Sequence, residues 1–410
     1  MTTRSRSPAA PQARSFPPRP CPVCDSLDRR ILYRQHFAEF SSGGLMAGYS
    51  VAICQDCGCG FADDIPPQKD FDRYYRRMSK YEFRHREGRE YQADRDRHDF
   101  VAGLVARWLP DRQARCVDIG CSNGGLLSAL RNRGYEHVFG VDPSAACCEA
   151  ARRLYGVDVR KGTIASFPRF EKPFDLAVLT GVLEHLRDHV PLMRRLLKIL
   201  APGAHVLIGV PDATLFTRWT NAPFQQFSIE HVNFFSPASL RNLFRRFGLS
   251  QAQLVQHDQV WQPGTTDPVL AALFRNDGGS REPLVPDRQT DRELRAYIRQ
   301  SQALDRAICR KIDALVKRAR PILVWGAGPH TLRLLRISTL RDARIKAIVD
   351  SNPRYHRRRI AGIPVLAPGT LRSDDTPILI STRAFQRDIE RQIRYDLRLQ
   401  NPLVLLYDDV

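Results

Sequence analysis

The chain has 410 residues, 43% of them hydrophobic, and a formal net charge of +19. This length and composition allow ordinary buried cores, and we expect two or three domains. No apolar run approaches the length of a membrane span and nothing at the start resembles a signal peptide, so we expect no membrane span. Ten cysteines in a chain of this length do not resemble a secreted disulfide framework, so we expect a reducing, cytoplasmic compartment. The oligomeric state stays open.

The positive charge raises the question of a nucleic-acid partner. The arginines are spread along the chain and never form a block interleaved with stacking aromatic residues. Arginine also outnumbers lysine, as codon bias alone can produce. A nucleic-acid partner is therefore unlikely, and attraction to a phosphorylated small molecule is the better interpretation.

The first twenty residues are rich in arginine and proline and contain no acid. Such a composition cannot bury enough apolar surface to order itself, so we expect a disordered tail over residues 1–18, with targeting as the alternative. The arginines concerned are Arg4, Arg6, Arg14 and Arg19.

Residues 19–66 contain two C-x2-C pairs, in "CPVC" and "CQDCGCGF". Each pair directs two thiolates at one point, and two pairs complete the tetrahedral set that zinc prefers. Four protein ligands leave no open coordination position, so we expect a structural zinc rather than a catalytic one; redox cysteines are the alternative. The expected ligands are Cys21, Cys24, Cys54 and Cys57, with Cys59 as a spare.

The segment "CVDIGCSNGGLLSALRNRGYEHVFGVD" reads as strand, glycine turn, helix and second strand. Asp118 lies on the first strand, 116–119, and Asp142 ends the second. In nucleotide-binding α/β folds an acid at the second strand end accepts the ribose hydroxyls, while the glycine turn lets backbone approach the ligand. The pattern D-x-G-x-x-x-G lacks the G-x-G-x-x-G of dinucleotide binders.

These residues resemble the first motif of class I S-adenosylmethionine-dependent methyltransferases. "FDLAVLTGVLEHL" is similar to the fourth strand and turn of that family, and "LLKILAPGAHVLIGVPD" to its helix, Pro-Gly turn and fifth strand. The resemblance implies an α/β fold with a Rossmann-like core over residues 67–255, and S-adenosylmethionine as cofactor.

The resemblance also assigns cofactor contacts. Near the methionine and ribose it implies Asp118, Gly120, Cys121 and Gly124. Asp142 is expected at the ribose diol, Ile164 against the adenine and Thr180 below the sulfonium. Glu184 and His185 form an acid–imidazole pair in "LEHL" that can equally cap the following helix, and we do not count them as catalytic.

The remaining third of the chain repeats the α/β pattern. Residues 256–290 are rich in Pro, Gly, Asp and Gln and predict loop or linker, and 290–320 predict a helix with a capping box from Thr290 to Glu293, so 256–318 is assigned as linker and helix. From 319 to 410, "PILVWGAGPHTLRLLRIST" and "IKAIVDSNP" predict a second Rossmann-like domain. Thr331 stands where the third glycine of a dinucleotide fingerprint belongs, so a scaffold or cleft wall is preferred over nucleotide binding.

A zinc module, a methyltransferase core and a second Rossmann-like domain together resemble the sugar C-methyltransferases that act on nucleotide-diphosphate keto-deoxysugars, with relatives in polysaccharide and antibiotic gene sets. That family carries a Glu-His pair after the fifth strand, which maps onto Glu230 and His231 in "SIEHVNFF", with the histidine as base. Its tyrosines after the zinc module map onto "FDRYYRRMSKYEF", which offers Tyr74, Tyr75 and Tyr81, and of these we select Tyr75 and Tyr81. Ser228 stands where such an enzyme has a tyrosine, which weakens the substrate assignment.

The chemistry supports the same residues independently. Sulfonium methyl transfer is an in-line displacement that requires an aligned nucleophile, and histidine titrates near neutrality and can remove the proton that frees it. The resemblance to the sugar C-methyltransferases implies a nucleotide-diphosphate sugar as the substrate. The alternatives are O-methylation of a glycan or secondary metabolite, an RNA methyltransferase, and a non-catalytic subunit; His231 can also be an ordinary core histidine.

Overall fold

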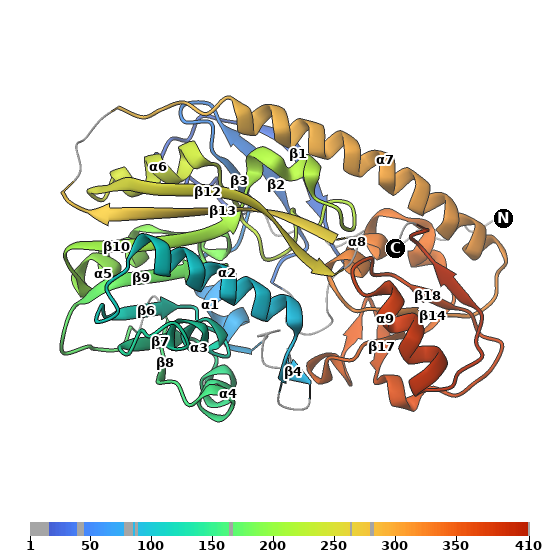
Figure 1. Ribbon diagram of the computed structural model, residues 1–410. Helices are drawn as coiled ribbons and strands as arrows, with labels where there is room; N and C mark the ends of the chain where they lie inside the picture. Colours follow the sequence, from blue (N-terminus) through green and yellow to red (C-terminus); the bar gives the residue numbers. More distant parts are fainter. Residues whose placement is uncertain are drawn as a thin grey trace.

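The computed structural model describes residues 16–38, 45–77, 85–86, 89–163, 167–262, 265–278 and 283–408. Three larger sheets organise them: a seven-stranded central sheet, a four-stranded sheet near the start of the chain, and a six-stranded sheet near its end. A long helix, α7 (Gln289–Lys317), runs along the molecule from the first two of these to the third (Figure 1).

The central sheet has the strand order β12-β13-β10-β9-β6-β7-β8, with β13 antiparallel to its neighbours and the five strands from β10 to β8 parallel. This order confirms the predicted class I methyltransferase-like α/β fold. The strands are β6 (Cys116–Ile119), β7 (Val138–Asp142), β8 (Val159–Lys161), β9 (Phe174–Thr180), β10 (Leu200–Pro211), β12 (Leu249–Gln262) and β13 (Thr265–Asn276).

Helices cover both faces of this sheet because its buried strands alternate their apolar side chains between two clusters. On one face Cys116 packs with α2 (Gln92–Trp108), α3 (Gly125–Arg131) and α4 (Ala145–Tyr155). On the other, Val117 packs with α5 (Val190–Ile199) and α6 (Pro237–Arg245).

The prediction of loop or linker over 256–276 is wrong at the level of secondary structure. Residues 256–262 belong to β12 and residues 265–276 form β13, so the predicted boundary at 255 falls inside a strand. Pro, Gln and Asp suggested a loop, but β12 is a polar edge strand and Pro268 lies in β13 opposite Asp258. Packing of β13 against β10 overrides the low strand propensity of such residues.

The first sheet has the order β1-β2-β3-β11. It consists of β1 (Arg29–His36), β2 (Gly48–Cys54), β3 (Gly60–Asp63) and β11 (Asn233–Phe234). The last of these strands belongs by sequence to the central part of the chain and begins two residues after His231, so the sheet of the cysteine-rich segment holds the backbone that directly follows the predicted catalytic pair.

Arg19, expected at the edge of a disordered tail, is instead buried with only 2% of its surface exposed. Its guanidinium donates hydrogen bonds to the carbonyls of Leu186 and Arg187, to the carbonyl of Val232 at 3.0 Å and to the Asn233 side chain at 2.8 Å. Arg19 is the first residue after the predicted tail over 1–18, and these contacts let it join the segments on either side of the candidate site.

The third sheet, β16-β17-β15-β14-β18-β19, belongs to the predicted second Rossmann-like domain. Its strands are β14 (Ile322–Trp325), β15 (Ile345–Val349), β16 (Arg359–Ile360), β17 (Ile363–Leu366), β18 (Ile378–Ile380) and β19 (Leu403–Leu405), all parallel except β16. The helices are α8 (Pro329–Ile337) and α9 (Gln386–Arg391).

The predicted capping box of α7 is not formed. Asp287 caps the helix instead, accepting hydrogen bonds from the backbone N–H groups of Gln289 at 2.9 Å and Thr290 at 3.2 Å. Glu293 turns outward to accept from the backbone N–H and hydroxyl of Thr217, which a local sequence pattern cannot foresee.

The shorter elements are α1 (Gln68–Arg77), the hairpin β4 (His85–Arg86) and β5 (Arg89–Glu90), and the 3-10 segments η2 (Leu183–His185), η3 (Ala213–Arg218), η4 (Thr339–Asp342), η5 (Pro353–Tyr355) and η6 (Pro368–Thr370), with the π-turn η7 (Gln392–Asp396) after α9. Within the described ranges, no helix is both long and apolar enough to cross a membrane.

Candidate active site

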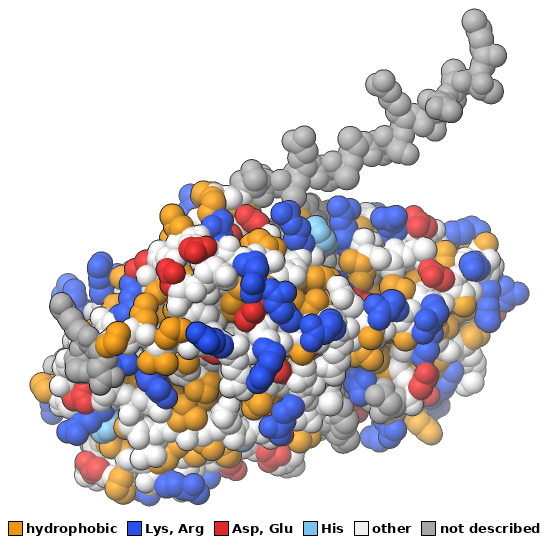
Figure 2. All heavy atoms as spheres, turned by 90° about the horizontal axis from the view of Figure 1, so that it is seen from above, with side chains coloured by type: hydrophobic (Ala, Val, Ile, Leu, Met, Phe, Trp, Pro, Cys, Tyr) orange, Lys and Arg blue, Asp and Glu red, His pale blue; other side chains and the backbone are white. Residues whose placement is uncertain are grey.

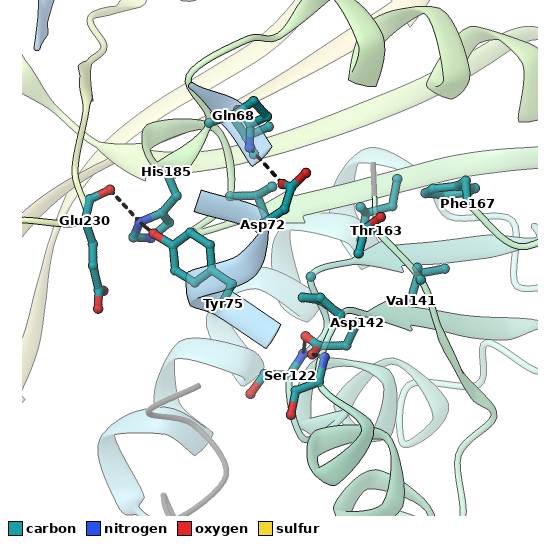
Figure 3. A pocket seen from close by; sticks show the side chains of 18 residues that line it. Gln68, Asp72, Tyr75, Ser122, Val141, Asp142, Thr163, Phe167, His185 and Glu230 are labelled. Carbon is teal, nitrogen blue, oxygen red and sulfur yellow. Dashed lines mark hydrogen bonds between the residues drawn. The ribbon is translucent and has the colours of Figure 1, made fainter. Parts of the chain in front are cut away.

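A cavity opens at the carboxyl ends of β6, β7 and β9, the edge at which α/β sheets bind ligands (Figure 3). The central sheet supplies the floor, α1 and η2 supply one wall, and the loop after β8 supplies another. The lining residues are Gln68, Asp72, Tyr75, Ile119, Gly120, Ser122, Val141, Asp142, Pro143, Ser144, Gly162, Thr163, Phe167, Gly181, Val182, His185, Leu186 and Glu230.

The glycine turn after β6 combines two different requirements. Gly120 has a φ of +79° and lines the cavity, and a Cβ built there would lie 2.7 Å from Val182. Gly124 also has a φ of +79°, but a Cβ there would meet Val157 and Ala151 on the α4 side. The first glycine keeps the cavity open, whereas the second allows α3 to pack closely on α4.

Asp142, at the end of β7, lines the cavity with both carboxylate oxygens already accepting backbone hydrogen bonds. Ser122 N–H donates to one at 2.9 Å and Ser144 N–H to the other at 2.8 Å. Burial raises the Asp142 pKa from 3.8 to about 6, against the effect of these two bonds. The fixed carboxylate has lone pairs left for a diol, which fits the ribose of S-adenosylmethionine.

Asp118 is buried on β6 beneath the glycine turn. Burial, and then the negative charge of Asp142, raise the Asp118 pKa to about 7, while Arg97 opposes the shift. A cationic amino group bound nearby would stabilise the carboxylate, so the methionine end of S-adenosylmethionine fits the electrostatics here.

Only some of the cofactor residues predicted from the sequence line the cavity. Gly120 and Asp142 line the cavity. Cys121 is buried with its sulfur facing Gly140, and the Thr180 methyl lies against Gly209, so neither side chain lines it. Ile164, like Tyr81, lies outside the described residues, and the predictions for both stay untested.

A polar network joins α1, η2 and the segment after β10 at one end of the cavity. The Tyr75 hydroxyl lies 3.0 Å from His185 Nδ1, and the same nitrogen lies 3.0 Å from the Glu230 carbonyl oxygen (Figure 3). Because a carbonyl only accepts, Nδ1 carries the hydrogen in this arrangement. The Tyr74 hydroxyl donates to Glu230 Oε1 at 3.0 Å. His185, left out of the sequence prediction, therefore belongs to this end of the cavity.

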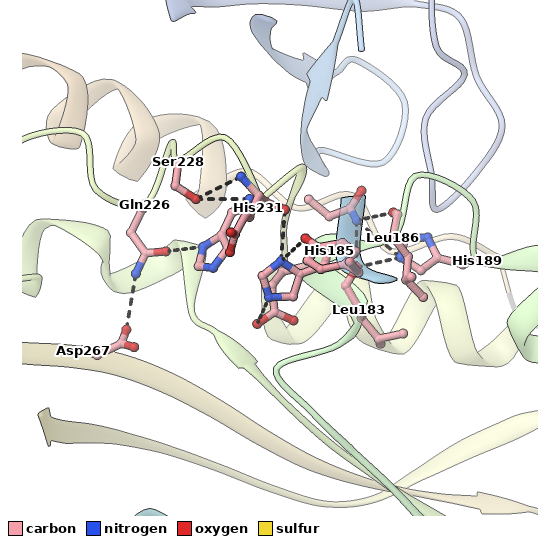
Figure 4. A network of polar contacts seen from close by, with 12 residues as sticks. Leu183, His185, Leu186, His189, Gln226, Ser228, His231 and Asp267 are labelled. Carbon is pink, nitrogen blue, oxygen red and sulfur yellow. Dashed lines mark hydrogen bonds and ion pairs between the residues drawn. The ribbon is translucent and has the colours of Figure 1, made fainter. Parts of the chain in front are cut away.

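His231 does not line the cavity but lies directly beside it. Its ring centroid is 4.9 Å from that of His185, and its Nδ1 is 3.3 Å from Gln226 Oε1 (Figure 4). Ser228 Oγ accepts from the backbone N–H groups of Glu230 and His231 at 3.3 and 3.2 Å, which shapes the turn that carries the pair. The two predicted residues thus point to different places.

The C-terminal domain also reaches this region. The pKa of Tyr74 is raised well above its usual value, first by burial and then by the Glu230 carboxylate and by Tyr355, while Arg358 opposes the shift. Tyr355 packs against the same apolar cluster as Tyr74. A basic, aromatic part of the C-terminal segment therefore lies near Tyr74, which donates to the Glu230 carboxylate.

The cysteine cluster has the predicted composition. One sulfur of each of Cys21, Cys24, Cys54 and Cys57 lies within 4.8 Å of the other three, with Cys21–Cys57 and Cys24–Cys54 separations of 3.5 Å. All four are free thiols rather than disulfides. Four thiolates so close together fit tetrahedral zinc, whereas Cys59 points to the Gly60 carbonyl.

A second group with metal-binding donors consists of Glu184, His185 and His231, whose ligand atoms lie within 4.8 Å of one another. Imidazole nitrogens and a carboxylate can bind a divalent metal, but the same groups can also move protons.

With this geometry in place, the comparisons identify the central domain. Residues 91–254 match the family model Methyltransf_23, described as a methyltransferase domain. This part of the chain is a class I S-adenosylmethionine-dependent methyltransferase domain.

The curated relatives are methyltransferases too. The chain is 38% identical over 114 residues to trans-aconitate 2-methyltransferase of Methylobacterium nodulans, which is 27% of this chain and 44% of that protein. It is 27% identical over 157 residues to ubiquinone biosynthesis O-methyltransferase of Marinobacter nauticus, 34% of this chain and 65% of that protein. The chain spans about half the length of the curated relatives it matches.

Among solved structures, magnesium protoporphyrin IX methyltransferase of Synechocystis PCC 6803 with bound SAH is 14% identical and covers 50% of this chain and 99% of its own, with a TM-score of 0.40. At that score the likeness does not bear on function.

Proposed function

We propose that the protein is an S-adenosylmethionine-dependent methyltransferase that methylates the carbon beside a ketone in a nucleotide-diphosphate-linked deoxysugar. The observation that carries the proposal is the meeting of a diol acceptor, Asp142, with an acid–imidazole cluster at one cavity. Bound in the cavity, the cofactor would supply an electrophilic methyl group. The chain must then align a nucleophile and remove its proton.

In this mechanism His231 is the base. It lies just outside the cofactor cavity, where a substrate would sit, and its Nδ1 contact with Gln226 leaves Nε2 as the basic nitrogen. Nε2 takes the proton from the carbon beside the ketone, and the electron pair of that C–H bond moves into the carbonyl to form an enolate. The Tyr75 hydroxyl accepts from His185 Nδ1–H in this arrangement, so its own hydrogen would be the donor to the enolate oxygen at this end of the cavity.

Two features favour an anionic, phosphorylated substrate. Tyr355 and Arg358 approach Tyr74 from the C-terminal domain, and arginine pairs well with phosphate oxygens. The visible face of the molecule also carries many Lys and Arg side chains, dispersed rather than gathered in one stripe (Figure 2). Dispersed charge suits attraction of a small anion better than a nucleic-acid track.

Oxygen methylation is the second candidate, and the names of the relatives favour it: the comparisons include a trans-aconitate 2-methyltransferase and a ubiquinone biosynthesis O-methyltransferase. The same base would then deprotonate a hydroxyl. Product analysis distinguishes a methoxy group from a new carbon–carbon bond.

Isotope exchange tests the carbon mechanism directly. In D2O with S-adenosylhomocysteine replacing the donor, a nucleotide keto-sugar should exchange one C–H for deuterium. His231→Asn should slow the exchange by about 10²–10⁴-fold, the range of general-base catalysis, with S-adenosylmethionine binding retained. His137→Asn, an exposed histidine of the same domain, is the matched control. Methylation of a true substrate without exchange at any carbon overturns the enolate mechanism.

A further inference from the structure

Two buried side chains lie behind His231 in a single file. Gln226 is fully buried and Asp267 is 7% exposed. Gln226 Nε2 donates to Asp267 Oδ1 at 3.3 Å, and Gln226 Oε1 lies 3.3 Å from His231 Nδ1 (Figure 4). Asp267 lies on β13, the strand that had been predicted as a loop from its composition.

The chemistry of the chain of contacts fixes its direction. An ionised carboxylate only accepts hydrogen bonds, so the NH₂ of Gln226 must face Asp267. The amide oxygen then faces His231, and because this oxygen also only accepts, Nδ1 of the imidazole must carry the hydrogen. Turning the amide over would place its oxygen against the carboxylate, which is repulsive.

We propose that Asp267 and Gln226 are positioning residues that hold His231 in the Nδ1–H tautomer, so that Nε2 is its basic nitrogen. The inference rests on the proposed role of His231 as the base. Asp267 orients the Gln226 amide so that an acceptor oxygen faces His231, while the charged carboxylate itself stays away from the imidazole. Neither residue contacts the cofactor cavity, so their effect on the reaction passes through His231.

The surroundings of His231 make such control necessary. Glu184 and His185 approach from η2, and Glu230 precedes it in the chain. Glu184 Oε1 lies 3.9 Å from His185 Nε2, so an acceptor is near both imidazoles. An imidazole among acceptors could place its hydrogen on either nitrogen, and a hydrogen on Nε2 would remove the lone pair that the base needs.

Nitrogen NMR measures the tautomer without any substrate. Protein labelled with ¹⁵N-histidine gives distinct signals for protonated and unprotonated ring nitrogens, and loss of one set in His231→Asn assigns the residue. The wild type should show His231 protonated at Nδ1 in the neutral state. Protonation at Nε2 overturns the proposal, whatever the variants do.

Two variants test the direction of the hydrogen bonds from His231 through Gln226 to Asp267, the first by disturbing it and the second by restoring it. In Asp267→Asn the new amide can face Gln226 with either its oxygen or its NH₂, so the Gln226 amide can turn and the Nδ1–H signal should be lost or mixed. Deuterium exchange on the keto-sugar should slow in proportion to the lost Nδ1–H population, by about twofold for an even mixture and by roughly 10–100-fold where 90–99% of the imidazole is in the wrong tautomer. In Asp267→Asn with Gln226→Glu, the new amide donates to a carboxylate that accepts from Nδ1–H, so the tautomer should return.

The controls separate the possible failures. Asp258→Asn removes a carboxylate of the neighbouring strand β12 that pairs with Arg218 at the surface, and should leave the His231 signals unchanged. Asp267→Asn that keeps Nδ1–H overturns the positioning role. Wild-type Nδ1–H together with normal exchange in His231→Asn would reject the base while leaving the tautomer assignment intact.

Discussion

Burial raises the pKa of Asp142, whereas two backbone hydrogen bonds lower it, and the resulting pKa makes cofactor binding depend on pH. Burial raises its pKa to about 6, so in the free protein at pH 5 the group is mostly protonated. A protonated acid accepts diol hydrogen bonds poorly, so affinity for S-adenosylmethionine should rise from pH 5 to pH 7 as Asp142 ionises. It should go on rising towards pH 8, because the cofactor's amino group also favours the ionised form of Asp118, whose pKa is raised to about 7. Binding near pH 6 should release a proton, which calorimetry in buffers of different ionisation enthalpy detects. A constant affinity from pH 5 to pH 8 would contradict this.

Removing the acceptor gives a second test at the same residue. Asp142→Ala leaves the ribose hydroxyls without a charged partner, a loss of about 1.5–3 kcal/mol, or roughly 10–150-fold in the dissociation constant measured by titration calorimetry. Asp158→Asn, an exposed acid just before β8, should bind normally.

The sequence was informative where a residue acts through its place on a strand. Strand ends and a glycine turn are local patterns, so the sequence could place Asp118 on β6 and Asp142 at the end of β7, where the second of them lines the cavity. His185 was missed because "LEHL" fits a helix cap as well as a site, and only the folding of α1 and the segment near Glu230 onto η2 separates the two. Gln226 and Asp267 meet through tertiary contacts that no spacing encodes.

At the scale of elements, β13 should be indispensable to the central sheet. Leu270 is fully buried where β13 pairs with β10, so Leu270→Ala should cost about 2–5 kcal/mol through lost burial and a cavity. Val260, 58% exposed on the neighbouring strand β12, is the exposed control. Val260→Ala should change the free energy of unfolding by less than about 0.5 kcal/mol. Denaturant unfolding of both variants makes the comparison; equal small effects would show that the hairpin is not part of the folded core.

The zinc hypothesis can be tested at Cys57 in the cysteine cluster, with the nearby Cys59 as the control. We expect about one zinc per chain by metal analysis. Cys57→Ser removes one of four clustered thiols and should lower metal content and thermal stability together. Cys59→Ser changes an equally buried cysteine outside the cluster and should retain the metal. Full stability in protein without zinc would end the hypothesis.

Elements were predictable where apolar pattern and breakers agree. The strand over 116–119 and the helix 290–320 follow from such patterns, and the structure has β6 and α7 there. The edge strand β12 was unpredictable because one of its faces is open to solvent and its residues are polar, so its order comes from pairing with β13 rather than from its own sequence.

At the scale of the whole molecule, a buried ion pair connects the first sheet to the helices beside the third sheet. Arg333 on α8 pairs with Asp305 on α7, contacts the Gln35 amide oxygen on β1 at 3.2 Å, and lies over the Phe224 ring. Asp305→Ala leaves the buried Arg333 guanidinium without its carboxylate, so we expect the free energy of unfolding to fall by about 3–5 kcal/mol.

The same helix provides the control. Lys311 on α7 pairs with Asp408 at the surface, and Asp408→Ala should cost less than about 1 kcal/mol because solvent screens that pair. Unfolding midpoints in denaturant compare the two. Similar small losses would show that the Arg333 contact does not hold the domains together.

The hairpin of β12 and β13 has a practical consequence for anyone expressing the catalytic part alone. The family match stops at residue 254, inside β12, and a fragment cut there would omit β13. The backbone from His205 to Pro211 would then be an open sheet edge, available for pairing with other copies, and such a product should precipitate. A workable fragment needs to continue through residue 278 and, because Arg19 and β3 support the segment after His231, to begin before Arg19.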